Sequence, residues 1–387
     1  MNDDEKQSLI KQIMCILAVI LLSALVRCSF SVQLPEADMS VPELIAYYGY
    51  PIEEHTAITE DGHHLVLHRI PNGIRENGMA KYVKRPVIFL QHGFVGSSAV
   101  WVTNLPSQSA GFVFADAGFD VWMGNARGNT YSVNHTSFTR DDDEYWKFTF
   151  DEISRYDLET MIDKALNVTG QTTVFYVGHS EGSVTMFAKL ATDPAFSSKL
   201  SRFFAFRIAK FFALCPITSM VHMRGIVSFL AHNFAQPITA IARLKNEFMS
   251  NFGLSQKLGK FICSVRILSA ICEYFVFQIA GEVTNQLNQT RISVYLTHIP
   301  GGTSSANLIH WAQLATTKHW RMFDFGNEHS NFIHYGVSSL VDRLRPEYLI
   351  ENNRLANFNH FDYIWGSEAA ERIYKPIIKT IRATTGK

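Results

Sequence analysis

A serine within a glycine-flanked pentapeptide is the strongest candidate for chemistry in this chain. Gly178-His179-Ser180-Glu181-Gly182 fits the pattern G-x-S-x-G, in which a sharp turn between a strand and a helix raises the serine hydroxyl above a sheet. The glycines allow so tight a turn because a Cβ there would clash with neighbouring chain. Residues 172–182 read as a buried strand that ends in the motif, and helical spacing follows. This context predicts a nucleophile rather than a structural serine.

A serine hydroxyl is a poor nucleophile until a base removes its proton. In the fold that uses this turn, the chain order is serine, then acid, then histidine. His360 lies near the C-terminus after a possible last strand at 347–355, and it is the predicted base. Other histidines compete with it on order alone: His298, His310, His319, His329 and His334.

Attack of a serine on a carbonyl group also needs two backbone N–H groups that stabilise the oxyanion. One should come from Glu181, the residue after the nucleophile, and the other from Phe94, in the loop after a strand at 87–93. The charge of Glu181 would oppose a developing oxyanion, so its side chain must point away or be paired.

The elements that must position these residues alternate between strands and helices. A hairpin is predicted at 55–71, with Asp61-Gly62 at its turn. Helical patterns, for example at 151–166, separate short apolar runs that read as buried strands, at 87–93, 119–128, 172–182 and 211–216. The pattern predicts an α/β fold with a mostly parallel sheet covered by helices on both faces.

Residues 217–300 differ from the rest, because they read as helices rich in Phe, Ile, Leu and Met. Alternation typical of a strand returns only at 292–298. We therefore expect a helical cap at 217–300 inserted between core segments 29–216 and 301–387. The apolar cap suits a lipid substrate and a lipid–water interface, although packing of the cap onto the sheet also requires apolar residues.

The composition excludes several other classes of protein. The 387 residues are 47% hydrophobic, which allows a sizeable core, and 35 basic side chains balance 35 acidic ones. The zero net charge leaves no basic field for nucleic acid. No H-E-x-x-H or paired C-x-x-C motif is present, so neither a metal nor a cofactor is expected.

The N-terminus has the features of a targeting signal rather than of a folded element. The apolar block 13–26 has the length of a signal-peptide core, and we expect residues 1–28 to be removed. A short membrane anchor or a buried helix is the alternative. Three glycosylation sequons, at Asn134, Asn167 and Asn288, suit the secretory pathway. No apolar run reaches the eighteen or so residues that a transmembrane helix needs.

The cysteines fit an oxidising compartment. Cys263 and Cys272 are close enough in sequence to form a disulfide. Cys215 follows the apolar run 211–214, and we interpret it as a buried core thiol rather than a nucleophile.

From about Val41 to Ile377, the chain resembles the acid lipases, the family of gastric lipase and lysosomal acid lipase. The resemblance rests on several specific segments: AYYGYPIEEHTAITEDG (46–62), FLQHGFVGSSAVWV (89–102), FADAGFDVWMGNARGNTYS (114–132), FTFDEISRYDL (148–158), GHSEGS (178–183), YLTHIPGGTSSANLIHWAQL (295–314) and NHFDYIWG (359–366).

The resemblance implies an α/β-hydrolase that cleaves long-chain esters such as triacylglycerols and sterol esters, without a cofactor, in a secreted or lysosomal setting. Ser180 matches the nucleophile and His360 the base. Phe94 and Glu181 match the oxyanion donors, although the family usually has Gln where Glu181 stands. The resemblance also implies that Cys263 and Cys272 form the cap disulfide.

One departure concerns the catalytic acid. The family has a strand, a turn and an Asp between the segment matching 334–336 and the histidine, whereas here 334–339 runs straight into 340–344. Asp342 is the substitute candidate, and Asp362 follows His360 too closely to orient its ring, so a structural role is expected. Three explanations stay open: an incomplete gene product or splice form of an active lipase, a severely weakened enzyme, and a lipid-binding protein without turnover.

Overall fold

The computed structural model describes residues 34–76, 84–193, 208–216, 235–249, 284–317, 322–324 and 357–385, and the single positions 196, 233, 353 and 355. The predicted signal peptide, the predicted disulfide between Cys263 and Cys272, and Asp342 lie outside these residues. Within them, no helix has the length and apolar character needed to cross a bilayer.

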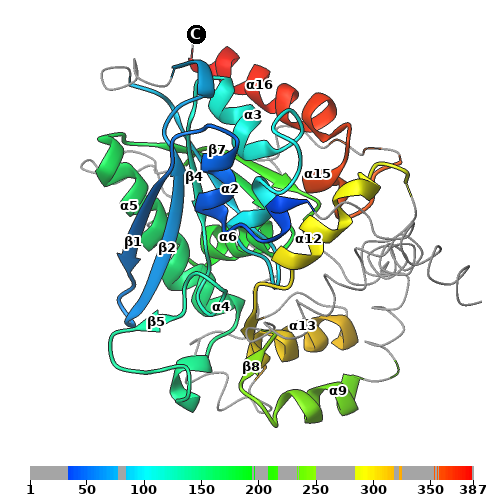
Figure 1. Ribbon diagram of the computed structural model, residues 1–387. Helices are drawn as coiled ribbons and strands as arrows, with labels where there is room; N and C mark the ends of the chain where they lie inside the picture. The colour runs from blue at the N-terminus through cyan, green and yellow to red at the C-terminus, as the bar shows by residue number, and fades with distance from the viewer. Residues whose placement is uncertain are drawn as a thin grey trace, which may run out of the picture.

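A mixed sheet forms the centre of the molecule (Figure 1). Its main path runs in the order β1-β2-β4-β3-β6-β7, and the short β5 pairs with β2. The first three strands pair antiparallel, while β4, β3, β6 and β7 are parallel. The strands are β1 (Glu53–Ile58), β2 (His63–Ile70), β3 (Val87–Gln91), β4 (Asp120–Gly124), β5 (Asn134–His135), β6 (Val174–His179) and β7 (Ile208–Leu214).

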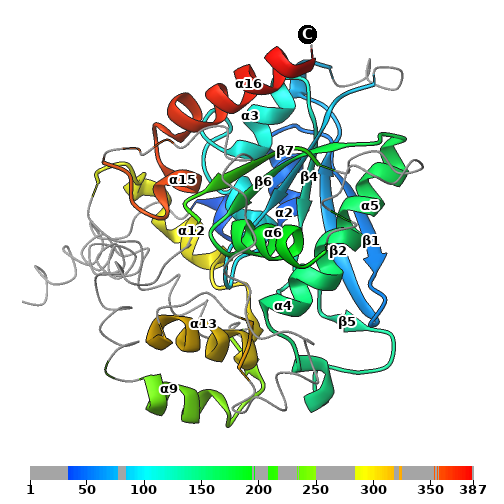
Figure 2. The ribbon, with the colours of Figure 1, turned by 180° about the vertical axis from the view of Figure 1, so that it is seen from behind.

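Helices cover both faces of this sheet, as Figures 1 and 2 show from opposite sides. Alternate side chains of β3 enter two different cores, Ile88 and Leu90 on one face and Val87 and Phe89 on the other. The first core is closed by α2 (Val41–Tyr47), α3 (Ala110–Asp116), α12 (Ile292–His298), α15 (Asp362–Trp365) and α16 (Lys375–Thr385). The second is closed by α5 (Leu158–Thr169) and α6 (Glu181–Thr192).

These elements confirm the predicted α/β fold, the hairpin and the four predicted strands. Strands β3, β4 and β6 are buried as predicted, whereas β7 lies at the end of the strand order and is mostly half-buried. The helix predicted at 151–166 is also present, as α4 (Phe150–Glu152), a π-helical stretch (Ile153–Asp157) and α5.

The strand predicted at 292–298 is wrong, because this segment is helix α12. The Asn288 side chain accepts a hydrogen bond from the Thr290 backbone N–H and starts a helical turn just before it. Ile292 and Tyr295, three residues apart and so on one helix face, are both buried. The Tyr295 ring stacks on Trp365 at 4.5 Å, so tertiary packing outweighs the strand-like alternation.

A smaller group of elements lies apart from the main sheet, below it in Figures 1 and 2. It contains α9 (Ala235–Ala242), β8 (Glu247–Phe248), β9 (Thr303–Ser304) and α13 (Ser305–Thr317). Strands β8 and β9 pair antiparallel, which joins the predicted cap to the residues that follow it. The cap boundaries themselves stay a prediction.

Candidate active site

The G-x-S-x-G segment forms a strained turn between β6 and α6. Ser180 has φ 54° and ψ −119°, a backbone conformation that costs a non-glycine residue of order 1–3 kcal/mol. The flanking glycines allow this turn, because a Cβ on Gly178 would lie 2.5 Å from the Gly182 carbonyl oxygen and a Cβ on Gly182 would lie 2.6 Å from that of His92. The side chain of Ser180 is buried at the carboxyl end of the parallel strands.

The loop after β3 packs directly on this turn. A Cβ on Gly93 would lie only 2.8 Å from the Cβ of Ser180, so glycine is what lets the loop approach. No hydrogen bond within the described residues occupies the backbone N–H of Phe94. The N–H of Glu181 begins α6, where the first N–H groups have no partner inside the helix. Two backbone donors are therefore available beside the serine.

Glu181 turns away from this position toward α13, as the sequence analysis required of its charge. Its Oε2 accepts hydrogen bonds from Trp311 Nε1 and, at 3.1 Å, from Asn307 Nδ2. Asn307 is oriented by its other end, because its Oδ1 accepts from the Phe150 backbone N–H. Burial raises the pKa of Glu181 to about 7, and the two hydrogen bonds oppose that rise.

His360 lies against the residue that precedes the serine. Its carbonyl oxygen accepts a hydrogen bond of 2.9 Å from His179 Nε2, and the two rings are 4.8 Å apart. Its Nδ1 is 3.0 Å from the Sγ of Cys215. Burial, with a smaller contribution from the neighbouring His179, lowers the pKa of His360 to about 3. The described contacts contain no hydrogen bond between Ser180 and His360.

Two histidines that compete with His360 for the role of base contact other parts of the molecule. His298 is half-buried, and its Nε2 contacts the Glu36 carbonyl oxygen at 3.4 Å. His310 stacks on Phe150 at 4.0 Å, with its Nδ1 3.9 Å from the Asp151 carboxylate. His319, His329 and His334 lie outside the described residues.

Comparisons with known proteins point to one family. The profile described as partial alpha/beta-hydrolase lipase region matches residues 41–105, and that of the alpha/beta hydrolase fold matches residues 86–239. The human protein named lysosomal acid lipase/cholesteryl ester hydrolase is 37% identical, over 90% of this chain and 92% of its own length. The chain belongs to the acid lipases.

Other acid lipases show the same extent of similarity. The Caenorhabditis elegans protein named lipase lipl-5 is 39% identical over 89% of this chain and 92% of its own length. The Bos taurus protein named gastric triacylglycerol lipase is 35% identical over 89% of this chain and 91% of its own length.

Among the residues that the structure describes, no carboxylate contacts the His360 ring. Asp342 lies outside the described residues. Asp362 is buried, and its Oδ2 accepts from the Asn359 backbone N–H and the Thr284 hydroxyl, both at 2.6 Å. These bonds fix the turn before α15, which agrees with the structural role expected for Asp362.

Cys215 is the residue of the site that the sequence analysis missed. We interpreted it as a core thiol, whereas it is half-buried at the end of β7 and contacts the His360 ring. The signal was its position: it directly follows the buried strand after the one that carries Ser180, and parallel neighbours end at the same sheet edge.

The remaining predicted sites are accessible to different degrees. Asn134 and Asn167 are exposed, whereas Asn288 is half-buried and its Oδ1 accepts from Thr290. The described residues contain no group of three His, Cys, Asp or Glu side chains that could hold a metal ion.

Proposed function

We propose that this acid lipase hydrolyses lipid esters through an acyl-Ser180 intermediate. His360 takes the serine proton as the hydroxyl oxygen attacks the ester carbonyl, and the N–H groups of Phe94 and Glu181 stabilise the oxyanion. The protonated imidazole then gives its proton to the departing alcohol. In deacylation, the same imidazole activates a water molecule. This chemistry requires no metal or organic cofactor.

The observation that supports this proposal most strongly is the backbone of Ser180. A φ of 54° and a ψ of −119° are costly for serine, and the Gly93 loop packs within van der Waals contact of the strained residue. The serine of a G-x-S-x-G nucleophile motif sits on a strained turn of this kind. It is the conformation that presents a hydroxyl to a substrate beside two free N–H donors.

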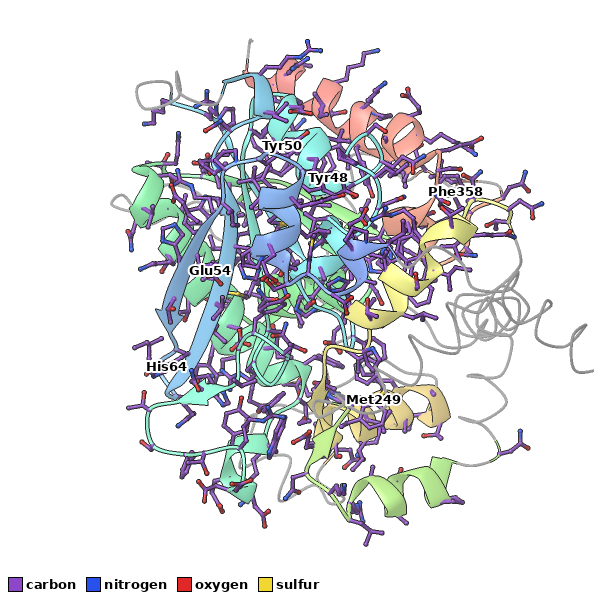
Figure 3. All side chains as sticks on the ribbon, viewed as in Figure 1. Tyr48, Tyr50, Glu54, His64, Met249 and Phe358 are labelled. Carbon is purple, nitrogen blue, oxygen red and sulfur yellow. The ribbon has the colours of Figure 1, made fainter. Side chains whose placement is uncertain are left out.

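The apolar surroundings support a lipid substrate. The Phe94 ring lies 6.2 Å from the rings of both Phe248 and Trp311, so the loop beside Ser180 faces aromatic side chains of β8 and α13. Between α9 and β8, Leu244 is 81% exposed, and Met249 follows β8 with 38% of its surface exposed (Figure 3). We propose that residues 217–300 form a cap over the acyl chain and that this exposed apolar edge meets the lipid–water interface.

Substitution of the nucleophile tests the proposed reaction. We expect Ser180→Ala to reduce hydrolysis of a soluble p-nitrophenyl ester and of a triolein emulsion by about four orders of magnitude. Ser137→Ala, at an exposed serine of the same chain, is the matched control and should retain full activity. Equal activity of the Ser180→Ala and wild-type proteins would refute the proposal.

A second candidate function is lipid binding without turnover. It is favoured by one observation: within the described residues, the His360 ring contacts a thiol rather than a carboxylate. A carrier would bind a fluorescent fatty acyl ester stoichiometrically and leave it intact, and Ser180→Ala would not change that. The two functions therefore give opposite results in one assay of binding and product release.

The N-terminal apolar block, the sequons and the cysteines bear on secretion and on the modifications that accompany it. We propose entry into the secretory pathway, removal of residues 1–28, glycosylation at Asn134, Asn167 and Asn288, and a disulfide between Cys263 and Cys272. Secretion from a eukaryotic host, followed by N-terminal sequencing and peptide mapping with and without a glycosidase, tests each modification. A mature chain that still begins at Met1 would contradict removal of the signal peptide.

A further inference from the structure

The end of β7 lies beside the proposed nucleophile. Strands β6 and β7 are parallel neighbours, and the Ser180 backbone N–H donates a 3.0 Å hydrogen bond to the carbonyl oxygen of Leu214, the last residue of β7. Cys215 comes next in the chain, and its Sγ is 3.0 Å from His360 Nδ1. A contact across 145 positions of sequence thus joins the strand after the nucleophile to the histidine segment.

We propose that the Cys215 thiol takes the positioning role of a triad acid, with the His360 Nδ1–H donating to Sγ so that the Nε2 lone pair faces Ser180. The inference rests on the proposed function, because positioning has a catalytic effect only if His360 is the base. A ring nitrogen that is held as a donor fixes the tautomer in which the other nitrogen is the acceptor.

The proton balance of the step follows from this arrangement. As the bond from Ser180 Oγ to the carbonyl carbon forms, the hydroxyl proton moves to His360 Nε2. The proton on Nδ1 stays in place and continues to donate to Sγ. The Nε2 proton then goes to the alkoxide as the ester bond breaks, and the alcohol leaves neutral. Cys215 neither gains nor loses a proton.

A neutral thiol can orient the His360 ring, but it cannot stabilise the positive charge that the ring gains when it takes the serine proton. Burial, and in smaller part the nearby charge of Asp362, raises the pKa of Cys215 to about 12, so Sγ carries no negative charge in the working range. The ring of His360 also faces His179, whose pKa is lowered to about 4 by burial. Nothing in these contacts stabilises an imidazolium, whereas a carboxylate at the same position would do so.

The backbone of Cys215 allows this idea to be tested directly. Its φ of 44° lies in the left-handed region, which Asp and Asn tolerate better than most residues. Cys215→Asp therefore places a carboxylate beside His360 Nδ1 at a position whose backbone suits it. Cys215→Asn is the matched control, because it has nearly the same shape without the charge.

The experiment compares wild type with Cys215→Asp, Cys215→Asn and Cys215→Ala in hydrolysis of a soluble p-nitrophenyl ester between pH 3 and 9, after equilibrium unfolding has shown that each variant is folded. We expect Cys215→Asp to raise kcat at least tenfold with little change in KM, and to move the acidic limb of the pH profile upward by more than one pH unit. Cys215→Asn should stay near wild type, and Cys215→Ala should lose about tenfold in kcat.

Two results would overturn the inference while leaving the proposed function intact. One is Ser180-dependent hydrolysis by wild type that neither Cys215→Asp nor Cys215→Ala changes in kcat or in the acidic limb. The other is a loss of activity in Asp342→Asn as large as that in His360→Ala, which would make Asp342 the acid. Absence of Ser180-dependent hydrolysis from both wild type and Cys215→Asp would instead reject the proposed function, and the positioning role with it.

Discussion

The ends of two neighbouring strands, β6 and β7, differ in how completely they are built for catalysis. At the end of β6, Ser180 is strained, buried and flanked by glycines, and the loop after β3 packs against it. At the end of β7, the corresponding position carries Cys215, a thiol against the ring of His360. The end of β6 thus has the strained turn expected of the proposed nucleophile, whereas the end of β7 offers the proposed base only a neutral thiol.

This difference indicates that the proposed nucleophile and the proposed base are positioned by separate parts of the chain. The turn at Ser180 depends on contacts among β3, β6 and α6. Strands β3 and β6 are neighbours in the sheet, and α6 directly follows the turn after β6. The environment of His360 depends on a segment near the C-terminus that reaches β6 through His179. The environment of His360 can therefore change while the turn at Ser180 stays intact.

The largest expected effect concerns the base. We predict that His360→Ala lowers kcat for a soluble ester by about four orders of magnitude, because the proposed base is lost and the Ser180 hydroxyl keeps its proton. His64→Ala, on β2 where this strand pairs with β5 (Figure 3), is the control and should leave kcat unchanged, because the His64 ring contacts Thr136 and no residue of the candidate site. Steady-state kinetics of the two variants measures the difference. A small loss of kcat in His360→Ala would contradict the assignment of His360 as the base.

The next prediction concerns stability at the end of β6. A Cβ on Gly182 would meet the backbone carbonyl of His92 at 2.6 Å, so Gly182→Ala must push β3 and α6 apart. We expect a loss of about 3 kcal/mol or more in the free energy of unfolding, measured by urea denaturation. Gly170→Ala, where φ is 62° and no heavy atom lies within 4 Å, should cost only about 1 kcal/mol. Equal losses of unfolding free energy in the two variants would show that the turn can accommodate a Cβ at Gly182.

Glu181 gives a prediction about pH. Its pKa is raised to about 7 from an ordinary 4.5, so the folded protein binds a proton more tightly than the unfolded chain, and stability falls as pH rises from about 4.5 to 7. Glu181→Gln should remove this loss, which amounts to about 3 kcal/mol at most. Unfolding free energies at pH 4.5 and 7.5 measure it. The same loss of stability in the Gln variant would assign it to other groups.

The activity profile should change along with stability. The His360 imidazole is unprotonated above a pKa of about 3, and Glu181 is neutral below about 7, so wild-type kcat/KM should be highest in between. A Glu181 carboxylate opposes the oxyanion, and Glu181→Gln should therefore keep its activity above pH 7. An alkaline limb that is unchanged in this variant would contradict the link between Glu181 and the oxyanion.

The smallest expected effect is a gain in stability. Because Ser180 adopts φ 54° and ψ −119°, which suits glycine, Ser180→Gly should be more stable than Ser180→Ala by about 1 kcal/mol while both are inactive. Thermal unfolding of the two variants compares them without any effect of the hydroxyl. Greater stability of the Ala variant would mean that the turn is not strained.

The sequence predicted the end of β6 much better than the end of β7, for a physical reason. Gly178, Ser180 and Gly182 are contiguous, and the strand and helix on either side carry their own periodic signals, so a local pattern specifies the turn. The pairing of Glu181 with Trp311 followed from its charge, although its partner could not be foreseen. Cys215 and His360 meet across 145 positions, and no local pattern encodes such a contact.

Helix α12 shows the opposite failure, in which a local pattern misleads. The alternation of apolar residues at 292–298 suited a strand, but burial of Tyr295 against Trp365 and the turn begun by Asn288 favour a helix. Short apolar segments are decided by the partners that fold against them.

The central claim is that Ser180 is an activated nucleophile, and covalent labelling tests it most directly. Purified protein is treated with a fluorophosphonate, digested and examined by mass spectrometry. The account predicts a phosphonyl adduct on the peptide that contains Ser180, formed by the wild-type protein and absent from Ser180→Ala. A folded wild-type protein that stays unlabelled at Ser180, under conditions that fully label another serine hydrolase, would contradict it.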